Sequence, residues 1–176
     1  MNKIALCCIV FFLSLEFGAL VSEENRDAGT QGLKVTVLPR AFTGREYLKL
    51  GKEGEHITVL FENVSGREIR LWGGLKNGGY QNMRVRLTDE SGSQSEARRA
   101  LITGSEIGDA SEIFKPGDKK IVEIYPGSKE WEGFPPTPET PQKYTVKIIY
   151  ESKMPANDPM SWIGTVESPE HFIWLY

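Results

Sequence analysis

Short runs of alternating apolar and polar residues recur along this chain, and most of them end at a turn signal. A period of two puts successive side chains on opposite faces of a β-strand, so that one face can meet a core. No window of helical length combines the apolar period of an amphipathic helix with capping residues. The pattern therefore predicts an all-β protein.

The strongest local signal is the stretch 56–72, HITVLFENVSGREIRLW. Its apolar residues include every second position from Ile57 to Phe61, and the alternation resumes at Ile69 after a break around Gly66. Two alternating runs on either side of a short Asn/Ser/Gly break are typical of a β-hairpin. We therefore expect the two runs to pair with each other.

The break contains the tripeptide Asn63-Val64-Ser65, which matches the sequon for N-glycosylation. Asn and Ser are also the residues that turn chemistry alone favours. The sequence leaves both interpretations open.

Further strands are predicted by the same alternation, at 33–38, 47–50, 80–88, 97–102, 119–125, 142–152, 162–166 and 171–176. Turn signals lie between them, among them DESGS at 89–93 and PGD at 116–118. Short strands in this number, with frequent turns between them, favour an immunoglobulin-like antiparallel β-sandwich of about seven to nine strands. We expect it to form a single domain over residues 32–176.

The N-terminal segment has the layout of a secretory signal peptide. A basic start at Lys3 precedes the almost wholly apolar run 4–15, and small residues follow up to Ser22. The run is shorter than the roughly 20 residues that a membrane span needs. We predict a signal peptide over 1–22, a flexible leader over 23–31, and a secreted or periplasmic protein without a membrane span in the mature chain. An uncleaved N-terminal anchor is the alternative.

Both cysteines, Cys7 and Cys8, fall inside the predicted signal peptide. The mature chain would therefore lack disulfides, thiolate catalysis and cysteine-ligated zinc. Removal of residues 1–22 leaves enough chain for one ordinary core. The net charge of −3 comes without a clustered basic footprint, which argues against a nucleic-acid partner.

No motif for catalysis stands out. His56 and His171 are the only histidines, and neither belongs to an H-E-x-x-H pattern, nor is there a G-x-S-x-G motif. The glycine-rich loop 73–79 precedes a predicted strand, whereas a phosphate-binding loop opens a helix. We predict a protein that is not an enzyme and that needs no cofactor or metal. A hydrolase with a carboxylate pair, or calcium bound by the acidic residues of 106–118, is the alternative.

The proline-rich segment 126–141 contains five prolines, so it can be neither a central strand nor a helix. At the C-terminus, alternate residues of 171–176 are aromatic, and Ile173 and Leu175 on the opposite face are also apolar. A strand of a β-sandwich normally packs one face on the core and exposes the other to solvent. Since both faces of this strand are apolar, we expect another segment to cover the face that does not meet the core. We expect the proline-rich segment to stay out of the sheet and to fold back over this second face. The alternative is an exposed binding surface, and the candidate residues are Trp131, Phe134, Phe172, Trp174 and Tyr176.

Four stretches resemble a known family. ITVLFENVSGREIRLW (57–72), MRVRLTDESG (83–92), IFKPGD (113–118) and KYTVKIIY (143–150) are similar, in that order, to the bacterial BsuPI-type proteinase-inhibitor domains and to related immunoglobulin-like domains of bacterial secreted proteins. The resemblance covers roughly residues 56–150 and implies an immunoglobulin-like sandwich. The proline-rich segment and the aromatic C-terminal strand depart from the inhibitor pattern, and no functional residue is carried over.

Together these features predict an exported, non-catalytic β-sandwich that binds a protein partner or a cell-surface polymer. A carbohydrate-binding module that uses exposed aromatic residues is the first alternative. A carboxylate-dependent hydrolase or a proteinase inhibitor is the second.

Overall fold

The computed structural model describes residues 32–39, 47–48, 55–71, 82–100, 111–152 and 159–176. The predicted signal peptide and leader, the glycine-rich loop and Trp72 lie outside these residues. Within them the secondary structure consists of twelve strands. This part of the chain has no helix long and apolar enough to cross a membrane.

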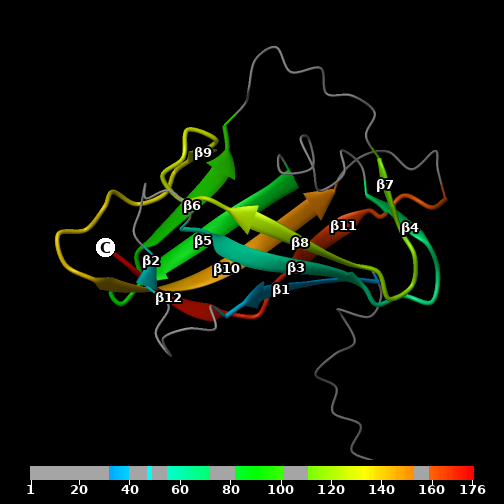
Figure 1. Ribbon diagram of the computed structural model, residues 1–176, viewed down its shortest axis with the longest axis horizontal. Helices are drawn as coiled ribbons and strands as arrows, with labels where there is room; N and C mark the ends of the chain where they lie inside the picture. Colours follow the sequence, from blue (N-terminus) through cyan, green and yellow to red (C-terminus); the bar gives the residue numbers. More distant parts are fainter. Residues whose placement is uncertain (1–31, 40–46, 49–54, 72–81, 101–110, 153–158) are drawn as a thin grey trace, which may run out of the picture.

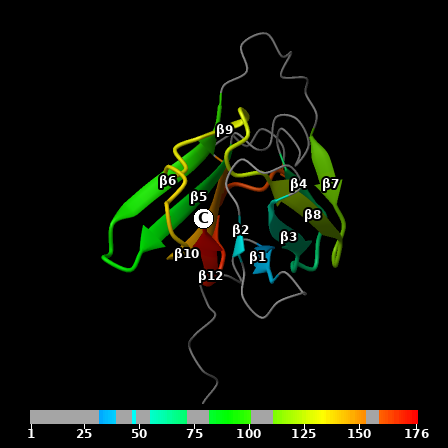
Figure 2. The same ribbon diagram turned by 60° about the vertical axis from the view of Figure 1, so that its left-hand side comes forward.

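The strands form two layers (Figures 1 and 2). One layer is a seven-stranded sheet in the order β2-β12-β10-β5-β6-β9, in which β11 also pairs with β10. Its strands are β2 (Tyr47–Leu48), β5 (Met83–Asp89), β6 (Gln94–Arg99), β9 (Trp131–Glu132), β10 (Gln142–Ser152), β11 (Gly164–Glu167) and β12 (His171–Leu175). All of its strand pairs are antiparallel except β2–β12, which is parallel.

The second layer contains a three-stranded sheet, β1-β3-β8, and a two-stranded sheet, β4-β7. Its strands are β1 (Leu33–Leu38), β3 (Ile57–Asn63), β4 (Ile69–Leu71), β7 (Glu112–Phe114) and β8 (Lys119–Ile124). The described strands outnumber the seven to nine predicted from sequence because several of them have only two or three residues.

The hydrophobic core lies between the layers and is built from alternate residues of the strands. Val59 and Phe61 of β3 and Val85 of β5 are fully buried. The Phe61 ring meets the ring of Tyr150 from β10 edge to face, with centroids 5.4 Å apart. Each large side chain buried in this way contributes about 1.5–3 kcal/mol. The predicted all-β sandwich is thus confirmed.

Strand β10 runs through the middle of the seven-stranded sheet, over the whole stretch predicted for it. It pairs with β5 along one edge and with β12 and then β11 along the other. Between the pairs Val146–His171 and Ile149–Glu167, three residues of the chain that joins β11 to β12 lie opposite two residues of β10. The extra residue is a β-bulge. Ser168 lies in the bulge and its hydroxyl accepts the N–H of Ile148 (3.0 Å). Pro169, which has no N–H to donate, lies in this bulge, so pairing with β10 continues on either side of it.

The predicted hairpin between 56–63 and 68–72 is not formed. Strand β3 pairs with β1 and β8, whereas β4 pairs with β7. The β3–β8 ladder reaches the Asn63 N–H, which donates to Asp118 O (3.0 Å), and pairing resumes between Ile69 and Phe114. Strands β3 and β4 are therefore consecutive parts of one bent strand, and β7 and β8 form its bent partner.

The side chain of Asn63 holds this bend together. Its amide donates to the carbonyls of Arg67 (2.8 Å) and Phe114 (2.9 Å), and its Oδ1 accepts the N–H (2.9 Å) and hydroxyl (2.6 Å) of Ser65. Asn63 is only 1% exposed. The nitrogen to which a glycan would be attached is thus buried and doubly bonded, so the sequon serves the turn in the folded chain.

Candidate functional site

The five candidate aromatic residues lie at opposite edges of the seven-stranded sheet. Trp131 belongs to β9 at one edge, and Phe172 and Trp174 belong to β12 near the other, with β6, β5 and β10 between them. At about 4.8 Å per strand pair, β9 and β12 are roughly 19 Å apart across the sheet. The prediction that Trp131 and Phe134 cover the C-terminal aromatic residues is therefore wrong.

Trp131 fills the core instead. The proline-free part of the segment is long enough for a two-residue edge strand, and Trp131 pairs with Arg99 of β6, so the expectation that the segment stays out of the sheet is also wrong. Trp131 is 7% exposed and belongs to the core between the layers. The Phe134 ring packs on it edge to face at a centroid distance of 6.2 Å.

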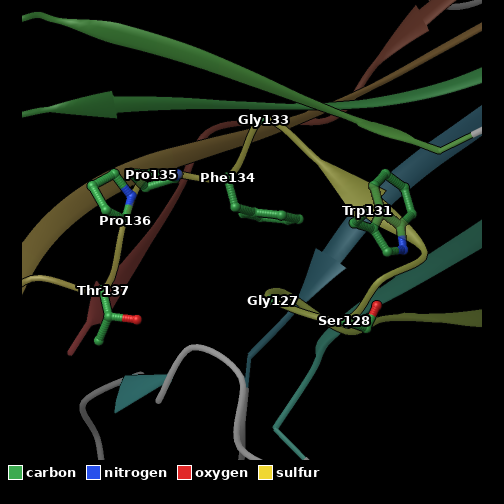
Figure 3. Close-up of a pocket in the computed structure, with 8 residues that line it drawn as sticks. All are labelled: Gly127, Ser128, Trp131, Gly133, Phe134, Pro135, Pro136 and Thr137. Carbon is green, nitrogen blue, oxygen red and sulfur yellow. The ribbon is translucent and has the colours of Figure 1, made fainter.

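Beside this pair lies a pocket of about 290 Å³ (Figure 3). Its walls are neutral: they consist of glycine, hydroxyl, aromatic and proline residues, namely Gly127, Ser128, Trp131, Gly133, Phe134, Pro135, Pro136 and Thr137. The Phe134 side chain projects between Trp131 and the prolines (Figure 3). A site of this size and character suits one apolar side chain or one small neutral ring.

The C-terminal aromatic residues form what we call the aromatic stripe: Phe172, Trp174 and Tyr176. Phe172 is 55% exposed, and Trp174 and Tyr176 are partly exposed. On the opposite face, Ile173 and Leu175 are buried in the core. Lys143 of β10 places its ammonium 4.4 Å from the centroid of the Phe172 ring, a cation–π contact.

Strand register extends the stripe into a row of uncharged side chains across the sheet. Phe172 is paired with Thr145, Thr145 with Thr88, and Thr88 with Gln94. Thr145 lies between two buried residues, and Thr88 and Phe172 each have one buried neighbour, so these three side chains point to the outer face. Gln94 is exposed and is placed on the same face by its pairing with Thr88. The row, called the uncharged row below, crosses four strands and is roughly 14 Å long. It combines one exposed ring with hydroxyl and amide groups that can donate and accept hydrogen bonds.

The charged side chains on the same outer face are paired with one another. Glu96 contacts Arg98 (2.8 Å), Arg84 (3.5 Å) and Arg86 (3.6 Å). Burial alone raises the pKa of Glu96, but the hydrogen bond from Arg98 and the charges of the arginines outweigh it and leave the pKa below its usual range. Nearer the bulge, Lys147 contacts Glu167 (3.5 Å) and Glu170 (3.6 Å).

The histidines lie in different parts of the fold. His56 precedes β3, where its ring is 5.4 Å from that of Tyr125 and its Nε2 is 3.7 Å from Glu123, whereas His171 begins β12. The described residues contain no cluster of three His, Cys, Asp or Glu that could hold a metal ion. Of the acidic loop, residues 106 and 109 lie outside them, and Glu112 contacts the ammonium of Lys120.

Sequence reasoning named Phe172 and Trp174 as candidates but gave no reason to consider Thr145, Thr88 and Gln94. Threonine is common on the wet face of any strand, so each of these residues is unremarkable by itself. Only the register of four strands brings them into one row.

Comparison with known proteins finds no matching family model, and no match is found among the curated proteins or the solved structures.

Proposed function

We propose that this chain is an exported, non-catalytic binding module that carries a neutral polysaccharide of a cell surface on the outer face of its seven-stranded sheet. The observation that supports it best is Phe172, a 55% exposed ring at one end of the uncharged row. Sugar rings offer an apolar C–H face that packs on an aromatic ring and hydroxyls that bond to Thr and Gln. The row is long enough for a few sugar units in line.

The electrostatics of the face favour a neutral ligand. Four carboxylates contact four cationic side chains, which leaves little unbalanced charge to attract an anionic or cationic polymer. The carboxylates are those of Glu96, Glu151, Glu167 and Glu170, and the cations are Arg84, Arg86, Arg98 and Lys147. Lys143 directs its charge toward the Phe172 ring. Export rests on the signal-peptide layout of residues 1–22.

Affinity electrophoresis through gels that contain a panel of polysaccharides tests the proposal. We expect at least one neutral polysaccharide to retard the protein, and Phe172→Ala to weaken retardation about tenfold, because the stacking ring is lost. Ile163→Ala, which trims an exposed apolar residue elsewhere, is the matched control and should bind like the parent. Retardation that survives Phe172→Ala, or no retardation at all, contradicts the proposal. Release of reducing sugar would show a hydrolase instead.

A protein partner is the second candidate, and the neutral pocket beside Phe134 favours it. A pocket of about 290 Å³ without charged walls accepts one apolar side chain of a docked segment. In that case Phe134→Ala loses the partner while polysaccharide retardation stays unchanged. Membership in the BsuPI-type domains and the immunoglobulin-like topology stay predictions from the turn and strand signatures, and neither candidate depends on them.

A further inference from the structure

In the part of the chain that the structure describes, strand β8 forms one edge of the three-stranded sheet, and its exposed side presents an apolar residue between opposite charges. Among the described residues, β8 pairs only with β3. Ile121, in the middle of β8, is 59% exposed, with Lys119 two residues before it and Glu123 two residues after it. An open strand edge with an exposed apolar side chain is a template for pairing with another strand.

The hydrogen-bond pattern determines which β8 residues are available for such pairing. The N–H of Asn63 donates to Asp118 O, and bonded pairs in an antiparallel ladder recur every second residue. The even-numbered residues of β8 therefore turn their backbone N–H and C=O groups to β3. Lys119, Ile121 and Glu123 turn theirs to the open edge, and their side chains share the outer face.

From this geometry we propose that β8 pairs with β8 of a second copy of the chain, antiparallel about a two-fold axis at Ile121. In this register the two Ile121 residues face each other, and Lys119 of each copy faces Glu123 of the other. Each of these facing pairs exchanges two backbone hydrogen bonds. The result is one continuous six-stranded sheet, β1-β3-β8 followed by β8-β3-β1 of the second copy.

Charge complementarity selects this register over its neighbours. An axis at Lys119, at Lys120 or at Glu123 sets like charges directly opposite each other, which is unfavourable across strands. An axis at Val122 sets Ile121 against Glu123. Only the axis at Ile121 gives two opposite-charge pairs and an apolar centre, and it leaves the ammonium of Lys120 on the inner side, where it already contacts Glu112.

Because one short edge strand buries less than the roughly 1,600 Å² of a standard interface, we expect a weak dimer whose population depends on concentration. Sedimentation equilibrium measures the dissociation constant of the dimer, on protein expressed from the full sequence and purified with the N-terminal processing that the host performs. Lys119→Glu and Glu123→Lys should each raise it about tenfold, since each turns two attractive pairs into repulsive ones. The double variant Lys119→Glu/Glu123→Lys restores attraction and should return to within about threefold of the parent.

Lys34→Glu is the matched control, because it makes the same charge change on the outer face of the same sheet but on β1. It should leave the dissociation constant unchanged, and circular dichroism checks that every variant is folded. A parent that stays monomeric at the highest attainable concentration overturns the proposal, even if a foreign strand then binds β8. Single variants that associate like the parent, or a double variant that is not rescued, overturn it as well.

Cross-linking tests the register separately, with Cys7 and Cys8 replaced by Ser. Ile121→Cys should form a disulfide-linked dimer on oxidation, because the two residues face each other at the axis at about 5.5 Å between Cα atoms. Lys119→Cys, equally exposed on the same strand, lies roughly 14 Å from its counterpart and should stay monomeric. Equal cross-linking of both variants contradicts the two-fold axis at Ile121.

Discussion

The bend at Asn63 and the turn at Asp89 begin with the same local chemistry and end in different structures. In each, a side-chain oxygen accepts the N–H and the hydroxyl of a serine two residues later, Ser65 or Ser91, at 2.9 and 2.6 Å. After Asp89 the chain reverses, and β5 pairs with β6. After Asn63 it bends and continues beside the same partner chain.

The difference lies in the remaining bonds. Asp89 has only acceptors, and its Oδ1 takes a further N–H from Ser93 within the turn, while Gly92 adopts φ +85° and closes the reversal. Asn63 has an amide that also donates, and it reaches Phe114 O, 51 residues away. An acceptor alone completes a local turn, whereas the added donor fastens the turn to a distant strand.

The largest expected effect follows from removing that donor. Asn63→Asp keeps the size of the side chain and the bonds from Ser65, but it buries a carboxylate against the carbonyls of Arg67 and Phe114. We expect the free energy of unfolding to fall by about 3–5 kcal/mol. Urea denaturation measures it. A loss no larger than that of an ordinary surface substitution contradicts the role given to the amide.

The surroundings of the two turns predict the next effect. Gly32 has φ +68°, and the bend packs against it just before β1. A Cβ at position 32 would therefore lie 2.5 Å from Cβ of Ser65. Gly32→Ala should cost about 2–4 kcal/mol. Gly92 has a positive φ but open space around it, so Gly92→Ala should cost about 1 kcal/mol. Thermal and urea unfolding of both variants decide the order, and Gly66→Ala, which meets nothing within 4 Å, is the control.

The smallest effect is expected at Asp89 itself. The hydrogen bond from the Ser91 hydroxyl, with those from nearby backbone N–H groups, lowers the pKa of Asp89. Its contribution to stability is therefore complete above the pKa of the unfolded chain and is lost as the pH falls through the lower folded value. Asp89→Asn keeps an accepting oxygen, so its free energy of unfolding should be near that of the parent at neutral pH. It should lack the loss of stability that the parent shows as Asp89 is protonated. An unchanged slope of stability against pH below pH 5 would argue against it.

Local patterns predicted much of the fold and only part of the candidate site. The alternation in 142–152 was sufficient for β10 because it reflects one buried face of one strand. It could not predict that Trp131 enters the core beside β6, since proline content argues against strands without stating where an edge strand fits. Likewise Phe172 was visible as part of an aromatic strand, whereas its neighbour Thr145 became relevant through register alone.

The sequence by itself determined where most strands and turns lie, but not β7 or β9. Side-chain alternation and the short bonds of Asn63 and Asp89 involve residues close along the chain. Only the tertiary structure decided which strands pair and which faces stay exposed. That choice rests on contacts such as Asn63 with Phe114 and Phe61 with Tyr150, which form between segments far apart in sequence. Local alternation is compatible with many strand pairings, and these distant contacts favour one of them only when the two layers close over a common core.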